Sequence, residues 1–242
     1  MSQPFLSIII PAHNEESRLP LALEQLFAFL KKQAYTYDVI VVENGSRDRT
    51  LAVGLEYANS IPSLRIIHLD ERGKGRAVRC GILESAAEYR FVCDADFSMP
   101  VQEINRFLPP LCNCDIAIAS REAPGAIRYN EPPFRHFTGR VFNYLIHLMV
   151  LPGLGDTQCG FKCFRGMVAE DIFPQQRLNG WSFDVEVLHV ARLHGWAIKE
   201  IPVPWMYFPG SKVSILRDSM RMFLDLLIIR RNSRLGVYAR KA

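Results

Sequence analysis

A strand, a polar loop and a helix follow one another three times within the first ninety-odd residues of the chain. Short apolar runs predict the strands, and apolar residues at helical spacing predict the helices between them. This alternation is typical of βαβ units that build a parallel sheet, so we expect an α/β fold with a mostly parallel sheet flanked by helices. The predicted strands are residues 6–10, 37–42, 64–69 and 89–93, and the predicted helices are residues 19–31, 50–59 and 76–88.

The remainder of the chain continues this pattern less regularly. Residues 122–135 are rich in Pro, Gly and charge and predict a mobile loop over a cleft. At 242 residues, the chain is long enough for one large domain, residues 1–213, followed by a basic amphipathic helix and tail, residues 214–242. The other predicted elements are a helix over 100–108, a strand over 115–120, a helix running to about 149, a helix opening at 181–186 and a strand over 197–201.

Polar side chains follow each of the first four predicted strands. In open parallel sheets, ligands bind beyond the carboxyl ends of the strands. The alternative is that these are ordinary polar loops, which explains one such cluster more readily than four in succession. We expect the following residues to converge on one crevice: His13, Asn14, Glu15, Glu43, Asn44, Lys74, Asp94 and Asp96.

Asp94 and Asp96 stand two residues apart directly after the fourth predicted strand. In extended backbone, residues i and i+2 point to the same side, so both carboxylates can face one cleft. Hard cations such as Mg²⁺ typically bind one or two carboxylates together with substrate phosphates. The pair therefore suits a nucleotide diphosphate held through Mg²⁺ or Mn²⁺, with Asp96 as the metal ligand. Asp-x-Asp triplets also occur in ordinary turns. The pair therefore indicates a site only together with the polar residues that follow the other predicted strands.

The phosphate-binding motifs of other nucleotide-binding folds are absent from the sequence. Residues 73–75, Gly-Lys-Gly, lack the spacing of a P-loop, and no Gly-x-Gly-x-x-Gly follows the first strand. A nucleotidyltransferase usually needs a glycine-rich, Arg-bearing loop after that strand. This chain has Pro-Ala-His-Asn-Glu-Glu there, at residues 11–16.

Membrane spans and thiolate metal sites are not indicated either. The longest apolar stretch, residues 141–151, contains Asn143 and His147 and is too short to span a bilayer. Nothing near the N-terminus resembles a signal peptide, which favours a cytoplasmic protein. In that compartment we expect reduced, mostly packed thiols at Cys80, Cys93, Cys112, Cys114, Cys159 and Cys163.

Five segments, taken together and in this order, resemble inverting family 2 glycosyltransferases of the GT-A fold. The last two are more particular and resemble the dolichyl-phosphate glucosyltransferase branch, close kin of the dolichyl-phosphate mannosyl enzymes. The resemblance covers about residues 5–215. The segments are Ile-Ile-Pro-Ala-His-Asn-Glu-Glu at 9–16, Val-Val-Glu-Asn-Gly-Ser-Arg-Asp-Arg-Thr at 41–50, Asp-Ala-Asp at 94–96, Asp-Thr-Gln-Cys-Gly-Phe-Lys at 156–162 and Phe-Asp-Val-Glu at 183–186.

The resemblance implies roles for individual residues. Glu43 departs from the family pattern, which usually has Asp at that position, and Asn44 stands where a second Asp is common. Gln158 and Asp184 are implied to lie near the sugar or the acceptor, with a capping or core hydrogen-bonding role as the alternative. Asp94 would contact the ribose and diphosphate and Asp96 the metal. The residues implied to hold the nucleotide sugar are Pro11, Ala12, Glu15, Glu43, Asn44, Lys74 and Asp94.

An acceptor that is a lipid phosphate needs cationic partners. Arg121, Arg135 and Arg140 lie beyond a strand end and in or beside the predicted loop. Because the guanidinium group pairs with phosphate in a bidentate way, we expect these arginines to bind the acceptor phosphate. The alternative is that they are solvated loop charges. A phosphate acceptor is already an anion at neutral pH, so positioning and electrostatics would supply most of the rate.

The C-terminal segment has apolar residues at helical spacing over residues 214–231. A basic amphipathic helix of this kind can lie in a membrane interface beside a polyprenyl chain. It can equally pack on the sheet or on a second copy of the chain. The apolar residues are Leu216, Met220, Phe223, Leu224, Leu227 and Ile228, and the basic ones are Arg217, Arg221, Arg230, Arg231, Arg234, Arg240 and Lys241.

These observations predict a metal-dependent enzyme that transfers a hexose, expected to be glucose from UDP-glucose, to a polyprenyl phosphate with inversion. We expect it to be peripheral on the cytoplasmic face of a membrane. The rival enzymes use GDP-mannose as the donor or a saccharide hydroxyl as the acceptor. A rival of another class is a nucleotide-sugar-binding module without turnover, which the intact pair Asp94 and Asp96 disfavours.

Overall fold

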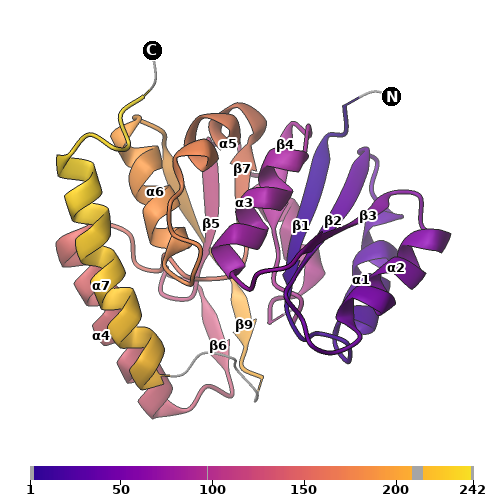
Figure 1. Cartoon of the computed structure of the whole chain (residues 1–242), viewed down its shortest axis with the longest axis horizontal. Coiled ribbons are helices and arrows are strands. Elements are labelled where there is room, and N and C mark those ends of the chain that lie inside the picture. Colours follow the sequence, from indigo (N-terminus) through magenta and orange to yellow (C-terminus); the bar gives the residue numbers. More distant parts are fainter. Residues whose placement is uncertain (1–2, 97, 209–214, 241–242) are drawn as a thin grey trace.

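The computed structural model describes residues 3–96, 98–208 and 215–240, and its centre is a seven-stranded sheet in the order β3-β2-β1-β4-β7-β5-β8 (Figure 1). β7 runs antiparallel to both of its neighbours, while the other pairs are parallel. The predicted α/β fold with a mostly parallel sheet is therefore confirmed. The strands are β1 (Leu6–Ala12), β2 (Tyr37–Asn44), β3 (Leu64–Leu69), β4 (Tyr89–Val92), β5 (Ile116–Ser120), β7 (Lys162–Arg165) and β8 (Ile198–Pro202).

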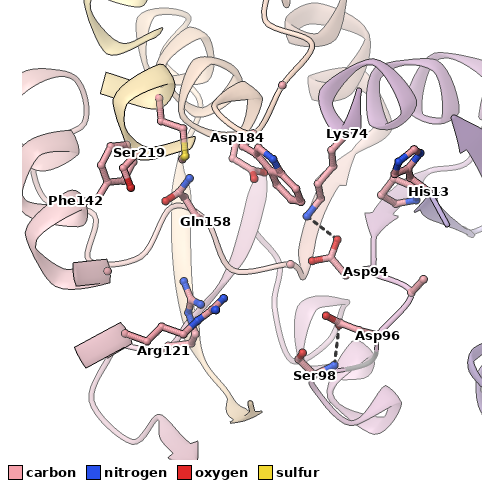
Figure 2. A pocket seen from close by; sticks show the side chains of 18 of the residues that line it. His13, Lys74, Asp94, Asp96, Ser98, Arg121, Phe142, Gln158, Asp184 and Ser219 are labelled. Atoms are coloured by element: carbon pink, nitrogen blue, oxygen red, sulfur yellow. Dashed lines mark hydrogen bonds and ion pairs between the residues drawn. The ribbon is translucent and has the colours of Figure 1, made fainter. Parts of the chain in front are cut away.

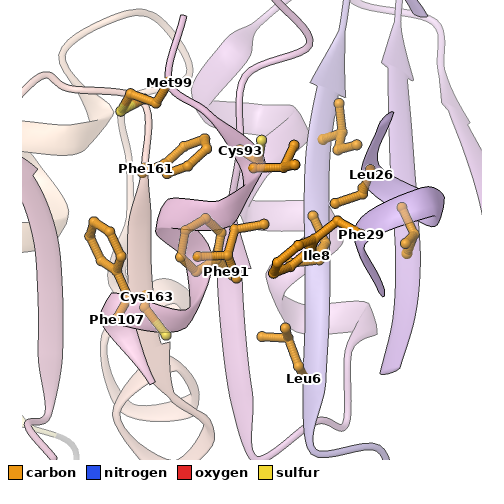
Figure 3. Packing of buried hydrophobic residues seen from close by; sticks show 14 of the residues in the cluster. Leu6, Ile8, Leu26, Phe29, Phe91, Cys93, Met99, Phe107, Phe161 and Cys163 are labelled. Carbon is orange, nitrogen blue, oxygen red and sulfur yellow. The ribbon is translucent and has the colours of Figure 1, made fainter. Parts of the chain in front are cut away.

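Alternate side chains of β1 pack in two separate apolar clusters. Ile8 and Ile10 pack on one face with α1 (Leu19–Leu30) and the 3₁₀ helix η1 (Val101–Phe107), whereas Ile9 packs on the other face. This period of two is the geometry of extended backbone. On the first face, Phe91, Phe107 and Phe161 meet edge to face, with ring centroids 5.1–6.2 Å apart (Figure 3).

The opposite face of the sheet carries most of the later helices. Its apolar cluster takes residues from each helix that covers this face, so the sheet is buried between two layers. The helices are α3 (Lys74–Glu84), α4 (Pro133–Met149), α5 (Gly166–Ile172), α6 (Phe183–Leu193) and α7 (Ile215–Arg234). The remaining elements are α2 (Thr50–Ser60), the 3₁₀ helix η2 (Phe173–Gln175), and the two-stranded parallel sheet of β6 (Ile127–Tyr129) and β9 (Pro204–Met206).

Pro11 lies inside β1 without costing the sheet a hydrogen bond. The Cys93 N–H donates to the Ile9 carbonyl at 2.9 Å, so the odd-numbered residues of β1 direct their peptide groups toward β4. The β1–β4 pairing ends at Ile9 and Val92, so Pro11 faces a position where β4 has already stopped. β1 therefore has no partner from β4 at Pro11. The chain that leaves β4 carries Asp94 and Asp96 away from the sheet at this point.

Several predicted boundaries are wrong for identifiable physical reasons. The helix predicted over 76–88 ends at Glu84, because Ser85 is extended and its hydroxyl accepts the Ala87 N–H. The helix predicted after Pro100 is a 3₁₀ helix. The segment predicted as a loop over 122–135 contains β6 and the start of α4. β6 pairs with β9, 77 residues later, and such long-range pairing leaves no local periodicity.

The cysteine prediction also needs correction. Cys112 and Cys114 form a disulfide, with Cα atoms 5.8 Å apart. The turn that follows Leu108 brings these two side chains together, which the short spacing alone did not indicate. Cys80, Cys93, Cys159 and Cys163 are free thiols, as expected.

The predicted C-terminal helix is present as α7, which packs beside α4 (Figure 1). The predicted start at Ser214 and the basic residue Lys241 lie outside the described residues, as do the side chains of Leu216 and Arg217. Within the described ranges, none of the helices combines the length and apolar character needed to cross a bilayer.

Candidate active site

A cleft of about 870 Å³ opens at the carboxyl edge of the sheet (Figure 2). Its walls come from the ends of β1, β2 and β4, the start of α3, the loop before α6, and the helices α4 and α7. The structure thus brings together residues that the sequence spreads over more than 170 positions. The predicted site residues that line the cleft are Pro11, Glu15, Asn44, Lys74, Asp94, Asp96, Arg121, Arg135, Gln158 and Asp184, together with His13.

Lys74 and Asp94 form the central ion pair of the cleft, with Nζ 2.6 Å from Oδ1 (Figure 2). Burial would lower the pKa of the Lys74 ammonium, but the carboxylates of Asp94, Asp184 and Asp96 outweigh it and raise that pKa. Lys74 also lies 5.4 Å from the centre of the Trp181 ring, close enough for a cation–π contact. The lysine is therefore held as a fixed positive charge at the first turn of α3.

Gly160 allows Asp94 to occupy this position. A Cβ atom on Gly160 would collide with Oδ2 of Asp94, so any larger residue requires the carboxylate to move. By contrast, Gly180 also lines the cleft, yet a Cβ there would meet nothing within 4 Å.

Asp96 points into the same space, and its Oδ1 accepts the Ser98 N–H at 3.1 Å. Burial and, after it, the neighbouring Asp94 carboxylate raise the pKa of Asp96. A bound cation would remove this repulsion. Among the described residues there is no cluster of three or more His, Cys, Asp or Glu side chains that could hold a metal ion unaided. The donor set therefore fits Mg²⁺ or Mn²⁺, which bind one or two carboxylates and complete their shell with water and ligand phosphates.

Asp184 lies deeper in the cleft and is paired with a lysine that the sequence did not single out. Lys162 Nζ is 2.8 Å from Oδ1 of Asp184 and donates to the Cys159 carbonyl at 2.5 Å. Burial raises the pKa of Asp184, and the ammonium groups of Lys162 and Lys74 limit the rise. A lone lysine within the otherwise apolar run 161–164 is the signal that could have revealed it, since a charge is rarely buried without a partner.

Arg121 is already engaged within the protein. Its Nε and Nη2 donate to the two carboxylate oxygens of Asp156 at 2.6 and 2.9 Å, and its guanidinium lies 5.3 Å from the centre of the Trp205 ring. Asp156 is fully buried. The Asp156 carboxylate therefore holds the Arg121 guanidinium in the cleft wall, and binding of the acceptor phosphate by Arg121 stays a prediction.

Four predicted residues do not line the cleft. Asn14 lies in the turn after β1, where its backbone N–H donates to the Ser46 hydroxyl at 3.0 Å and its Oδ1 accepts the Arg47 N–H at 2.8 Å. Ala12 is buried in the apolar core, and Arg140 is exposed on α4 outside the cleft. Glu43 is 1% exposed, and its carboxylate accepts the Ser46 N–H at 2.6 Å and a hydrogen bond from His68 Nδ1 at 2.5 Å. These bonds outweigh burial and lower the pKa of Glu43. Glu43 therefore stabilises the loop after β2 without facing the cleft.

Asn44, beside Glu43, does reach the cleft and joins two of its walls. Its Nδ2 donates to the Ala12 carbonyl at 2.8 Å, and its Oδ1 accepts the Gly73 N–H at 3.0 Å. The end of β1 and the turn before Lys74 are therefore fixed to each other through one amide side chain. An aspartate here would lack the donor that the Ala12 carbonyl needs.

Other cationic side chains also line the cleft. Arg72, Arg177 and Arg221 are exposed, and each comes from a different segment. No local pattern marks Arg72 or Arg177, and Arg221 was predicted only as part of the basic C-terminal helix. Arg135 stacks with its guanidinium carbon 5.1 Å from the centre of the Tyr207 ring. The cleft therefore combines an acidic centre with a cationic rim, an arrangement suited to a ligand with phosphate groups.

Comparison with known proteins agrees with this geometry. The family described as "Glycosyl transferase family 2" matches residues 7–173. A dolichyl-phosphate beta-glucosyltransferase of Homo sapiens is 35% identical over 93% of this chain and 74% of the relative. The enzyme of the same name from Dictyostelium discoideum is 32% identical over 98% of this chain and 77% of the relative.

Solved structures show a similar fold. Glucosyl-3-phosphoglycerate synthase from Mycobacterium tuberculosis, in complex with Mn²⁺, UDP and glucosyl-3-phosphoglycerate, superimposes with a TM-score of 0.69 at 12% identity, covering 96% of this chain and 80% of that one. Mannosyl-3-phosphoglycerate synthase from Rubrobacter xylanophilus gives a TM-score of 0.68 at 15% identity, covering 96% and 75%. At these identities the likeness concerns the fold alone.

The Arg121–Asp156 pair predicts a pH dependence of stability. Burial would raise the pKa of Asp156, but the Arg121 guanidinium and its hydrogen bonds lower it to about 2. The resulting stabilisation is complete above the unfolded-state pKa of about 3.9 and is lost as the pH falls toward 2. In urea titrations, Asp156→Asn should lower the free energy of unfolding by about 3–5 kcal/mol at pH 7, because Arg121 loses its partner. This difference should shrink between pH 4 and 2.

The control is Glu71→Gln, which removes an exposed ion pair with Arg76. It should change the free energy of unfolding by less than about 1 kcal/mol at every pH. A deficit in Asp156→Asn that stays constant from pH 7 to 2 would contradict the assignment.

Proposed function

The chain belongs to glycosyltransferase family 2, and from this premise we propose that it transfers glucose from UDP-glucose to a polyprenyl phosphate of the dolichyl type, with inversion at the sugar. The observation that carries the proposal is the Asp94, Asp96 and Lys74 constellation at the carboxyl edge of the sheet. Its support comes from relatives whose names state this acceptor and sugar, and from a structural neighbour bound to UDP and Mn²⁺.

The donor diphosphate would lie between Lys74 and the carboxylate of Asp96. Lys74 supplies a fixed positive charge, and the ion pair with Asp94 keeps the Lys74 ammonium group oriented. Asp96 would hold Mg²⁺ or Mn²⁺, with Asp94 as the second candidate ligand. When bound, such an ion neutralises the charge that develops on the leaving nucleoside diphosphate. Pro11, Glu15 and Asn44 would contact the nucleotide at the ends of β1 and β2, where they line the cleft.

The sugar and the acceptor would occupy the other half of the cleft. Gln158 and Asp184 can hydrogen-bond sugar hydroxyls there, and the Lys162 ammonium keeps Asp184 in place. Arg135, with Arg177 and Arg221, would receive the acceptor phosphate from the cationic rim. Because that phosphate is an anion at neutral pH, the site needs no strong general base, and its residues accelerate the reaction by orientation and electrostatics.

A panel of donors and acceptors tests this proposal. The protein with Mn²⁺ should transfer sugar from UDP-glucose, but not from GDP-mannose, to a short polyprenyl phosphate. Asp96→Asn should lower kcat/KM by roughly a hundredfold or more, because the charge on the leaving group loses its support. Glu56→Gln, an exposed carboxylate on α2 outside the cleft, should leave the rate unchanged. Transfer to a saccharide hydroxyl with no transfer to any polyprenyl phosphate would refute the lipid acceptor.

We further propose that the protein meets its acceptor at a membrane through an apolar surface on α4 and α7. α4 would present a stripe of apolar side chains at intervals of three and four residues, and α7 a shorter apolar patch beside it. The same two helices line the cleft through residues on other faces, among them Phe142 and Met222, so a lipid phosphate would reach the cleft by passing around α4 and α7. This α4–α7 surface consists of Phe134, Phe137, Val141, Tyr144 and Leu148 on α4 and of Met220, Leu224, Leu227 and Ile228 on α7, all of them exposed.

Charge favours a membrane over a second copy of the chain as the occupant of the α4–α7 surface. Arg140, Arg230, Arg231 and Arg234 are exposed on the same two helices. Two copies of a surface with this excess of positive charge would repel each other, whereas anionic headgroups would attract it. The cytoplasmic face of that membrane stays a prediction from the sequence.

Vesicle flotation tests the α4–α7 surface. The double variant Phe137→Ser with Tyr144→Ser should bind vesicles of phosphatidylcholine and phosphatidylserine at least about tenfold more weakly than the wild type, since two large apolar contacts are lost. The matched control is Leu21→Ser with Leu55→Ser, which removes exposed apolar side chains from α1 and α2 on the other side of the molecule (Figure 1). Equal binding by both variants, or a wild-type dimer that only the first variant dissociates, would contradict membrane docking.

A further inference from the structure

Glu186 is a carboxyl on α6 with no exposed surface, and it does not line the cleft. Its Oε2 accepts the backbone N–H groups of Arg177 and Leu178 at 2.9 and 2.7 Å. Its Oε1 accepts the hydroxyl of Tyr238 at 2.6 Å. A buried carboxylate is tolerated only when donors such as these satisfy it. Glu186 therefore joins two segments that are sixty residues apart in the chain.

The first of these segments, residues 177–181, forms the wall of the cleft beside Lys74. The Gly75 N–H donates to the Asn179 carbonyl at 3.0 Å, and Gln176 Nε2 donates to the Gly75 carbonyl at 2.9 Å. The approach is so close that a Cβ on Gly75 would lie 2.7 Å from the Leu178 carbonyl oxygen. Residues 177–181 therefore support the first turn of α3, which carries Lys74.

The second segment follows α7 and is anchored on the far side of α6. Tyr238 is 1% exposed, and its ring packs edge-on against His189 at a centroid distance of 6.2 Å. Its carbonyl oxygen accepts a hydrogen bond from His194 Nε2 at 2.8 Å, and Arg240 pairs with Asp171 at 2.9 Å. Contacts on three sides fix the tyrosine, so its hydroxyl is presented to Glu186 in one orientation.

We propose that Tyr238 is a positioning residue for the donor half of the cleft. By hydrogen-bonding Glu186, it holds residues 177–181 against the first turn of α3 and so fixes Lys74 and Trp181. The segment that follows α7 thus sets the shape of the cleft wall beside Lys74. The effect on catalysis rests on the proposed function, because it assumes that the nucleotide sugar binds beside Lys74.

Removal of the Tyr238 hydroxyl tests this role. In Tyr238→Phe, Glu186 keeps two of its three donors and the ring stays packed, so the fold should persist. The KM for UDP-glucose should rise roughly tenfold, as expected for one hydrogen bond to a buried carboxylate, while kcat changes by less than about twofold. The matched control is Tyr57→Phe, which removes a hydroxyl bonded to Glu24 at 3.0 Å on the α1–α2 side of the molecule.

Amide hydrogen exchange on the protein without ligand gives a readout that does not depend on the donor. Peptides covering residues 176–181 and the start of α3 should exchange faster in Tyr238→Phe than in the wild type or in Tyr57→Phe. Unchanged exchange would overturn the proposal whichever sugar is transferred. Faster exchange with an unaltered KM would overturn the link to donor binding. If UDP-glucose is not the substrate, faster exchange still supports the positioning of residues 177–181 by Tyr238.

Discussion

The ion pair between Lys74 and Asp94 is the contact on which the rest of the cleft depends. It joins the first turn of α3 to the end of β4, and Gly160 leaves the space that Asp94 requires. Negative and positive groups alternate along Asp94, Lys74, Asp184 and Lys162, whereas Asp96 lies beside a group of the same sign, Asp94. Each of the four alternating charges is stabilised by a neighbour of the opposite sign, so the cleft can keep several ionised groups in a partly buried place.

The topology of the sheet explains how these groups meet. β4 stops before β1 does, which opens the sheet beside Pro11 and releases the chain carrying Asp94 and Asp96. The antiparallel strand β7 enters next to β4 and brings Gly160 to Asp94 and Lys162 to Asp184. Because β7 runs in the reverse direction, it begins at the carboxyl edge of the parallel strands, so Gly160 and Lys162 at its start lie at that edge. The parallel strand β5 reaches the same edge with its last residues and brings Arg121 there.

The regular first half was predictable from sequence, because strands buried on both faces leave apolar runs and the helices between them leave a 3.6-residue period. The polar residues at those strand ends were found for the same reason. Contacts made across the fold were not predictable: β6 with β9, Lys162 with Asp184, and Arg121 with Asp156. Arg121 in particular looked like a free cation, since its buried partner lies thirty-five residues away.

The most direct test of the acidic centre is Mn²⁺ binding followed by electron paramagnetic resonance, with and without UDP. Two carboxylates alone should bind Mn²⁺ weakly, and UDP should tighten binding because its phosphates complete the shell. Gly160→Ala should weaken the ternary complex roughly tenfold by displacing Asp94, a loss of the size seen when the support of a metal ligand is removed. Gly139→Ala, on α4, should match the wild type, because a Cβ there would meet nothing within 4 Å. UDP binding that is unaffected by chelation of the metal, or equal Mn²⁺ affinity in both glycine variants, would contradict this account.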